Sequence, residues 1–118
     1  MELKFITREQ FEKASTYVQN YLKEYFNYIN TLYDNGEKIL YGKYIDNIYN
    51  VPLLTEGQII DIIENELSYI VGLDLIFGKG YKVNLAKDYD IETNKFNRLD
   101  ALWEALIDLI ETEELRDY

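Results

Sequence analysis

The chain has 118 residues, of which 47% are apolar, and it contains neither cysteine nor histidine. A chain of this length builds one core, so we expect a single domain over residues 1–118. The missing cysteine excludes disulfides and thiolate metal sites. No apolar run approaches the ~18 residues of a membrane span, and the start lacks a signal pattern, so we expect a cytoplasmic protein that binds no membrane.

Charge is distributed unevenly along the chain. Residues 1–50 carry seven acids and six bases, whereas residues 51–118 carry fifteen acids and six bases, which gives the net charge of −10. Such a field repels nucleic acid and attracts a basic protein. The charge therefore favours a basic protein partner over direct nucleic-acid binding, with solubility alone as the alternative reason for it.

The first residues predict a short strand and then a long helix. Leu3–Ile6 has the apolar pattern of a strand, and Thr7 with Gln10 has the spacing of a capping box. Apolar residues then recur at helical spacing as far as Leu32, and the pattern stops at residues 34–36, Asp-Asn-Gly. We expect one helix of about 25 residues here.

Tyrosines follow one another along this predicted helix, at positions Tyr17, Tyr21, Tyr25 and Tyr28. One interpretation is a half-buried edge of the core with the hydroxyls reaching water. Tyrosine is also enriched at protein interfaces, so a homodimer through the tyrosine-rich first half is the second interpretation.

Residues 37–50 are ambiguous between strand and helix. Residues 39–41 and 44–45 flank Gly42-Lys43, which suits a two-residue hairpin turn, and we favour this hairpin. The apolar residues of the segment also fit a helical spacing, which leaves a mostly α-helical protein as the alternative. Pro52 marks a break.

Two elements are expected between residues 55 and 85. Thr55 and Gln58 form a second capping box before an amphipathic helix, which Gly72 is expected to end. Two apolar runs, 73–77 and 81–85, then flank the turn residues Gly-Lys-Gly at 78–80. This pattern predicts a β-hairpin.

The last predicted helix covers Asn97–Glu114. One face is an apolar stripe that must face a core: Leu99, Leu102, Trp103, Leu106, Leu109 and Ile110. The other face carries four acids without a Lys or Arg between them: Asp100, Glu104, Asp108 and Glu111. Like charges at this spacing repel by roughly 0.2–0.5 kcal/mol per pair, so folding alone disfavours them. We take these acids as candidate contacts for a basic partner.

A second acidic segment precedes this helix. Asp88, Asp90, Glu92 and Asn94 alternate like the first half of a calcium loop. The second half does not match, because Thr93 stands where the loop needs glycine and Leu99 where it needs glutamate. We therefore expect an acidic loop that leads to Asn97 as the N-cap of the last helix, with no metal and no cofactor, and we take Asp88, Asp90 and Glu92 as further candidate contacts for the partner.

The sequence offers no catalytic constellation. Both serines, Ser15 and Ser68, fall in helical patterns, and no histidine or cysteine is present to activate them or replace them. The acids crowd onto helix faces rather than pairing as general acid and base. We expect a protein that is not an enzyme.

Residues 99–106, LDALWEAL, resemble a helix of the barstar family of ribonuclease inhibitors, which has Asp where this chain has Glu104. The resemblance implies that Asp100 and Glu104 contact the phosphate-binding cations of a nuclease. Thr7–Phe11 and Asp74–Ile76 are similar to short stretches of colicin-type nuclease immunity proteins. Both resemblances imply a bacterial inhibitor protein.

The patterns together predict an α+β fold, with three amphipathic helices packed on a small antiparallel sheet built from hairpins. The expected function is that of a small acidic inhibitor of a basic nucleic-acid-handling protein, most simply an immunity protein to a bacterial toxin nuclease. Two alternatives stay open. One is a phage-type DNA mimic that blocks a restriction or CRISPR enzyme, and the other is an interaction module that inhibits nothing.

Overall fold

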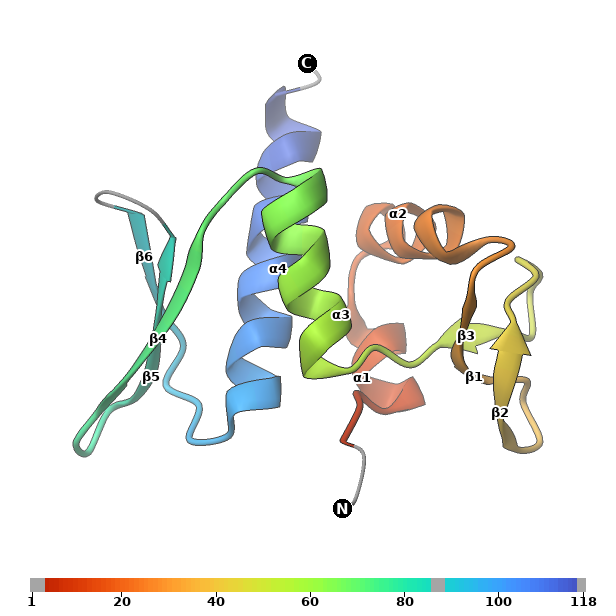
Figure 1. The fold of residues 1–118 in the computed structure, drawn as a ribbon, viewed down its shortest axis with the longest axis horizontal. Coiled ribbons are helices and arrows are strands. Elements are labelled where there is room, and N and C mark those ends of the chain that lie inside the picture. Colours follow the sequence, from red (N-terminus) through yellow and green to blue (C-terminus); the bar gives the residue numbers. More distant parts are fainter. Residues whose placement is uncertain (1–3, 86–88, 117–118) are drawn as a thin grey trace. The chain divides into compact units, whose positions relative to one another are not determined.

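The computed structural model describes residues 4–85 and 89–116, and Figure 1 shows its helices and strands. Within these residues the fold is α+β, as predicted, with four α-helices and two antiparallel sheets of three strands each, one helix and one sheet more than expected. The residues group into two compact units, an N-unit (Phe5–Leu54) and a C-unit (Thr55–Tyr118 with Met1–Lys4). We describe each unit by itself, and the expected single domain stays a prediction.

The predicted long helix of the N-unit is wrong, because two short helices and a strand take its place. Helix α1 covers Arg8–Lys13 behind the predicted capping box, and α2 covers Thr16–Phe26. Between them Ala14 is extended, with ψ 158°, and the hydroxyl of Ser15 accepts a hydrogen bond from the backbone N–H of Val18. A serine oxygen at this position starts a new helix, which explains why the apolar spacing continues across the break.

Helix α2 ends before the tyrosine pattern does. Asn27 is its C-cap, and Tyr28 adopts a left-handed conformation with φ 71° that no helix continues through. The chain then enters strand β1, Asn30–Asp34, whose Thr, Leu and Tyr side chains suit a sheet. Tertiary pairing with the next strand has here overridden a helical spacing.

Strand β1 is the centre of the first sheet, which has the order β2-β1-β3. Strand β2 covers Ile39–Lys43, and β3 covers Val51–Pro52. The hairpin turn lies at residues 35–38, where Gly36 has φ 96° and its N–H donates to Asp34 Oδ1 at 2.7 Å. The predicted turn at Gly42-Lys43 is therefore wrong, as is the helical alternative, because both residues lie in β2.

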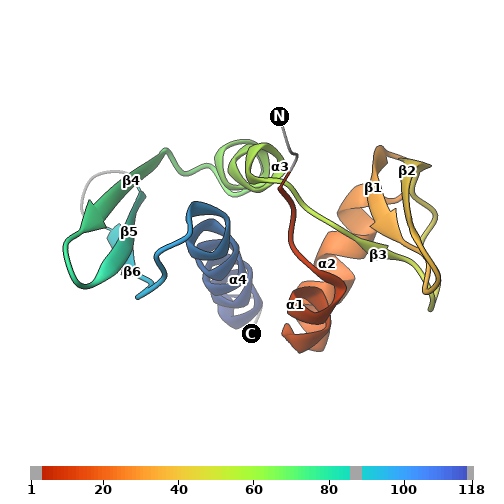
Figure 2. The same cartoon turned by 90° about the horizontal axis from the view of Figure 1, so that it is seen from below.

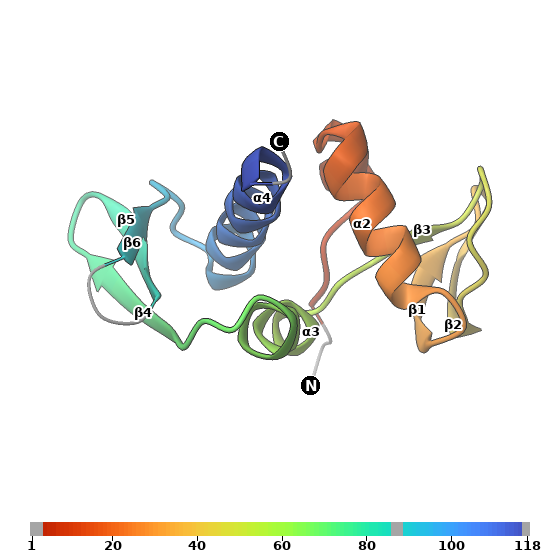
Figure 3. The same cartoon turned by 90° about the horizontal axis from the view of Figure 1, so that it is seen from above.

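One face of this sheet builds the core of the N-unit. Thr31 lies opposite Gly42, and Tyr44 follows Gly42 by two residues, so Thr31 and Tyr44 point to the same face. Both residues are buried. The Tyr44 hydroxyl donates to the backbone oxygen of Asn50 at 3.0 Å. Helices α1 and α2 both contact β3, and Figure 3 shows α2 beside the sheet. Phe11, Val18, Leu22 and Phe26 supply the helical half of this core.

The C-unit begins with helix α3, Glu56–Asp61, behind the predicted capping box of Thr55 and Gln58. The helix continues as a π-helix, η1, over Ile62–Glu66. Ser68, with φ 64°, ends it, whereas the sequence predicted Gly72 as the stop.

The second sheet has the order β4-β5-β6. Strands β4 (Val71–Ile76) and β5 (Gly80–Leu85) form the predicted hairpin. Strand β6, Tyr89–Glu92, pairs with β5 where the sequence suggested an acidic loop. Gly80 has φ 92°, and a Cβ atom there would lie 2.7 Å from the backbone of Lys95, so the position requires glycine.

The last helix, α4, covers Arg98–Arg116, and Asn97 caps it by accepting the N–H of Asp100 at 3.1 Å, as predicted. All six residues of the predicted apolar stripe are buried. Helix α4 packs against α3 and β5, and Figure 2 shows it between them. An ion pair of 3.2 Å between Arg98 and Glu56 joins the starts of α4 and α3. Among the described residues, no helix is long and apolar enough to cross a membrane.

Candidate functional site

The division into two units also divides the charge. The N-unit carries six acidic and five basic residues, and the C-unit carries sixteen acidic and seven basic residues. The net charge is therefore −1 on the N-unit and −9 on the C-unit. An excess of one sign attracts the opposite sign over several ångströms, so a site for a basic partner belongs on the C-unit.

The predicted acidic stripe lies on α4, and its four members differ in exposure. Asp108 is exposed, whereas Asp100, Glu104 and Glu111 are half-buried. Arg98, at the start of the helix, pairs with α3 rather than with the stripe. Within the described part of the chain, Asp108 and Glu111 form no ion pair.

Asp108 has a neutral partner from the sheet. The Tyr89 hydroxyl of β6 donates to Asp108 Oδ2 at 3.2 Å, and the two residues lie at the side of α4 that faces the sheet. Partial burial raises the pKa of Tyr89, and the negative charge of Asp108 raises it further. Asp108 therefore has a hydrogen-bond partner within the fold. Because a neutral phenol leaves the carboxylate its charge, this acid still attracts cations.

Glu104 is the member of the stripe with an unsatisfied atom. Its Oε2 is buried and has no hydrogen-bond partner within the described residues. A carboxylate oxygen that loses water without gaining a donor destabilises the fold. Since neighbours at i−4 and i+4, Asp100 and Asp108, are also acidic, the sequence adds repulsion to this cost.

Asp90 and Glu92 lie on β6, away from α4. Successive side chains of a strand point to opposite faces. Tyr89 points to α4. Asp90 and Glu92, which alternate with it along the strand, therefore point to the outer face of the sheet. There Asp90 lies 3.8 Å from the ammonium of Lys82. The structure therefore separates these two acids from the helix stripe, while Asp88 lies outside the described residues.

The sequence prediction missed a third group of acids, on α3 and η1. Asp61, Glu64 and Glu66 are all exposed, and no Lys or Arg occurs between residues 56 and 78. Figure 1 shows that α3 with η1 and α4 run side by side in the same direction, so both helices present their carboxyl ends at the same end of the unit. The absence of bases over this stretch was the signal in the sequence.

Acids at this end act against folding. The carboxyl end of a helix carries a partial negative charge, which acidic side chains reinforce and basic ones offset. The last turn of η1 contains Glu64 and Glu66 and no basic residue, whereas Asp108 and Glu111 lie more than a turn before the end of α4, which is Arg116. We define the acidic helix face as Asp108 and Glu111 of α4. Glu64 and Glu66 of η1 form a separate exposed group of acids in the same unit.

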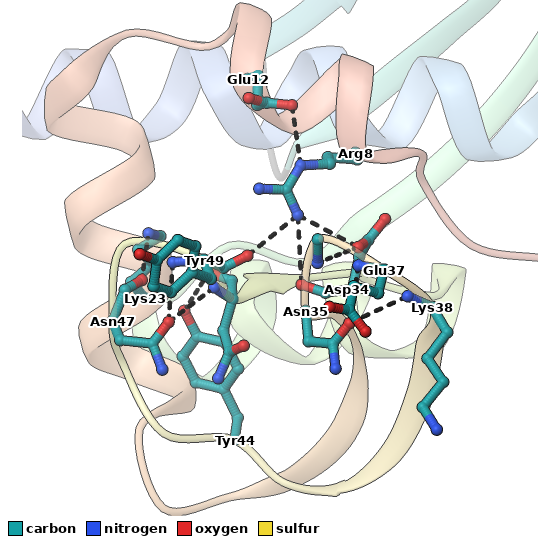
Figure 4. Close-up of polar contacts among 12 residues, drawn as sticks. Arg8, Glu12, Lys23, Asp34, Asn35, Glu37, Lys38, Tyr44, Asn47 and Tyr49 are labelled. Carbon is teal, nitrogen blue, oxygen red and sulfur yellow. Dashed lines mark hydrogen bonds and ion pairs between the residues drawn. The ribbon is translucent and has the colours of Figure 1, made fainter.

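The polar contacts around Arg8 join separate elements of the N-unit. Figure 4 shows Arg8 of α1 between two acids, with Nη1 at 3.2 Å from Asp34 Oδ1 and Nε at 3.1 Å from Glu12 Oε1. The same guanidinium donates to the backbone oxygen of Tyr49 at 3.0 Å. These contacts join α1 to the β1–β2 turn and to the loop before β3, so Asp34 supports the fold.

An open hollow of ≈ 510 Å³ lies beside this network. The hollow is lined by Asn35, Gly36, Glu37, Asn47, Tyr49 and Asn50. This lining contains one carboxylate and one phenol, but no serine, threonine, cysteine or lysine that could act as a nucleophile. Over the described ranges, no three residues of the His, Cys, Asp and Glu types come together as a metal site.

No protein-family model, curated protein or solved structure matches the chain.

Proposed function

We propose that this chain is a small acidic inhibitor that binds a basic nucleic-acid-handling protein, specifically an immunity protein to a bacterial toxin nuclease. One observation carries the proposal: the C-unit concentrates a charge of −9, and its helices carry acids that folding alone disfavours, in the stripe of like charges on α4 and in the last turn of η1. A face maintained against stability is typical of a binding surface.

The acidic helix face suits the cleft of a nuclease. Such clefts present Lys and Arg to phosphates, and carboxylates bind the same cations with charge-assisted hydrogen bonds. The long-range field of the unit raises the rate of encounter, and contacts at Asp108 and Glu111 fix the complex. The resemblance of residues 99–106 to the barstar family adds Asp100 and Glu104 as contacts. An inhibitor of this kind works in the cytoplasm, where it protects the cell that makes the toxin.

A DNA mimic is the second candidate, and one observation favours it. Asp90 and Glu92 lie on the outer face of the sheet, so acids occur on more than one face of the C-unit. An immunity protein needs one compact acidic patch, whereas a mimic needs carboxylates spread over an extended surface as phosphates are.

The experiment purifies the proteins encoded by the genes that flank this one, among which the proposal expects a basic nuclease, and assays them on DNA and RNA with increasing amounts of this chain. The lack of any nuclease among them would count against both candidates. We expect cleavage to stop at equimolar inhibitor. The paired variants Asp108→Lys/Glu111→Lys and Asp90→Lys/Glu92→Lys separate the two candidates. Loss of inhibition in the first pair alone indicates an immunity protein, and comparable loss in both indicates a mimic. Full cleavage at a tenfold excess of the parent chain would refute both.

A further inference from the structure

Strand β2 forms an unpaired edge of the first sheet, because β1 is its only neighbour among the strands of residues 4–85 and 89–116. Its backbone groups alternate between the two sides. The N–H of Asn35 donates to the Lys38 oxygen, and the N–H of Tyr44 donates to the Ile29 oxygen. Hydrogen-bonded pairs alternate along an antiparallel ladder, so Leu40 and Gly42 bond to β1. The N–H and C=O groups facing the open side are those of Ile39, Tyr41 and Lys43.

The side chains of this edge are apolar and exposed. Ile39 is 51% exposed and Tyr41 is 73% exposed, and both lie on the sheet face opposite the buried Tyr44. Natural proteins protect open edges with charges, prolines or covering segments. Within the described residues β2 has one charged residue, Lys43, at its end, and its middle is unprotected.

The N-unit as a whole combines apolar exposure with little charge. Seven of its large apolar side chains are exposed while its net charge is −1: Tyr28, Ile29, Ile39, Tyr41, Ile45, Ile48 and Tyr49. Exposed apolar area of this kind marks protein contacts. Two copies that met through their C-units would bring together charges of −9 and −9, whereas two N-units meet without such repulsion. Between two copies of this chain, charge therefore favours contact through the open edge of the N-unit over contact through the C-unit.

We propose that β2 pairs antiparallel with β2 of a second copy, across a two-fold axis beside Tyr41, so that the two first sheets become one continuous sheet. This register opposes the outward-facing groups of Ile39, Tyr41 and Lys43 to their counterparts and leaves no strand residue unpaired. It also places Lys43 directly opposite Ile39 of the second copy. Glu37 of the second copy then lies diagonal to Lys43, within reach of an ion pair between the two side chains. The same patch serves both subunits, as a two-fold interface requires. The inference goes beyond the inhibitor function and does not depend on it.

The first test compares two prolines by light scattering coupled to size exclusion at tens of micromolar chain. Tyr41→Pro removes an outward N–H and no bond to β1, and edge strands accept proline there. The control is Leu75→Pro on β4. Its N–H is also outward, because the opposite residue, Tyr81, bonds to Lys95 and Thr93 on the other side. We expect a dimer for the parent and Leu75→Pro, and a monomer for Tyr41→Pro.

The second test fixes the register with variants that keep the backbone intact. Ile39→Lys and Ile39→Glu remove the same apolar side chain and set opposite charges against Lys43 of the second copy. Residue 39 also lies opposite Asp34 of its own β1, where Lys is favoured over Glu, so melting temperatures of the two variants at a concentration where both are monomeric measure that separate effect. We expect the dissociation constant of the dimer to rise at least tenfold for Ile39→Lys relative to Ile39→Glu. A monomeric parent, a dimer that survives in Ile39→Lys, or equal constants for the two Ile39 variants would overturn the proposal. These outcomes decide it even where Tyr41→Pro fails to fold.

Discussion

Replacing Glu104 by methionine should stabilise the fold. The buried Oε2 of Glu104 has no donor, and leaving such an atom unsatisfied costs about 1–3 kcal/mol, of which we take the lower end because the side chain is half-buried. Methionine has a similar length and helix propensity and needs no partner. It also removes the repulsion with Asp100 and Asp108, about 0.2–0.5 kcal/mol for each.

The free energy of unfolding should therefore rise by about 1–2 kcal/mol in Glu104→Met. For a small domain, each 1 kcal/mol raises the melting temperature by roughly 4–8 °C. Urea unfolding followed by tryptophan fluorescence measures the change, since the single tryptophan, Trp103, is buried beside this position on α4. Asp108→Asn is the control, and its free energy should stay within about 0.5 kcal/mol of the parent because the residue is exposed. A Glu104→Met protein that is no more stable than the parent would refute the reasoning.

The remaining predictions concern the core of the N-unit and the second sheet. Burial raises the pKa of Tyr44 above its ordinary value of 10.0, with a further rise from Asp46. The unfolded state then loses its proton first, so stability should hold below pH ~10 and fall as pH rises above it, and Tyr44→Phe should flatten this decline in urea unfolding at alkaline pH. A slope equal to the parent's would contradict that assignment. Gly80→Ala should destabilise the C-unit by about 1–3 kcal/mol because the added Cβ meets the backbone of Lys95 in a left-handed conformation. In Gly42→Ala no heavy atom lies within 4 Å of the added Cβ, so it is the matched control, and equal melting temperatures for the two alanine variants would show that the close approach at Gly80 is wrong.

Local chemistry was sufficient to predict part of the fold. Both capping boxes, at Thr7 and at Thr55, rest on side chains that bond three residues away. The β4–β5 hairpin rests on glycines that accept positive φ, and α4 rests on a long apolar stripe. In each case the interaction that selects the structure lies within a few residues of the chain.

The missed elements depend on contacts that are distant in the sequence. Strand β1 has helical apolar spacing, and only its pairing with β2 and β3 makes it extended. The interruption at Ser15 was visible in principle, because serine is a good N-cap, but the spacing on either side concealed it. The acids of strand β6 alternate as they do in the first half of a calcium loop, which indicated a loop. The same alternation of acidic and apolar residues is also the pattern of a strand with one solvated face.

The candidate site was predicted in part. The stripe on α4 follows from helical periodicity, and its residues lie on the helix that was expected. Periodicity could not show that Tyr89 of β6 reaches Asp108, nor that Asp90 turns to the opposite face of the sheet. It also did not draw attention to Glu64 and Glu66 of η1, which are exposed in the same unit as α4.

The central claim is that the acidic helix face, rather than net charge, binds the basic partner. The most direct measurement compares the affinity of two double variants for the nuclease that the proposal expects among the flanking genes, by calorimetry at physiological salt. Asp108→Lys/Glu111→Lys changes the face, and Glu9→Lys/Glu24→Lys makes the same change in net charge at exposed positions of the N-unit that lie away from β2. The account predicts a loss of about 2–5 kcal/mol, roughly 30- to several-thousand-fold, for the first variant and at most a few-fold loss for the second. Equal affinities for the two variants would contradict it.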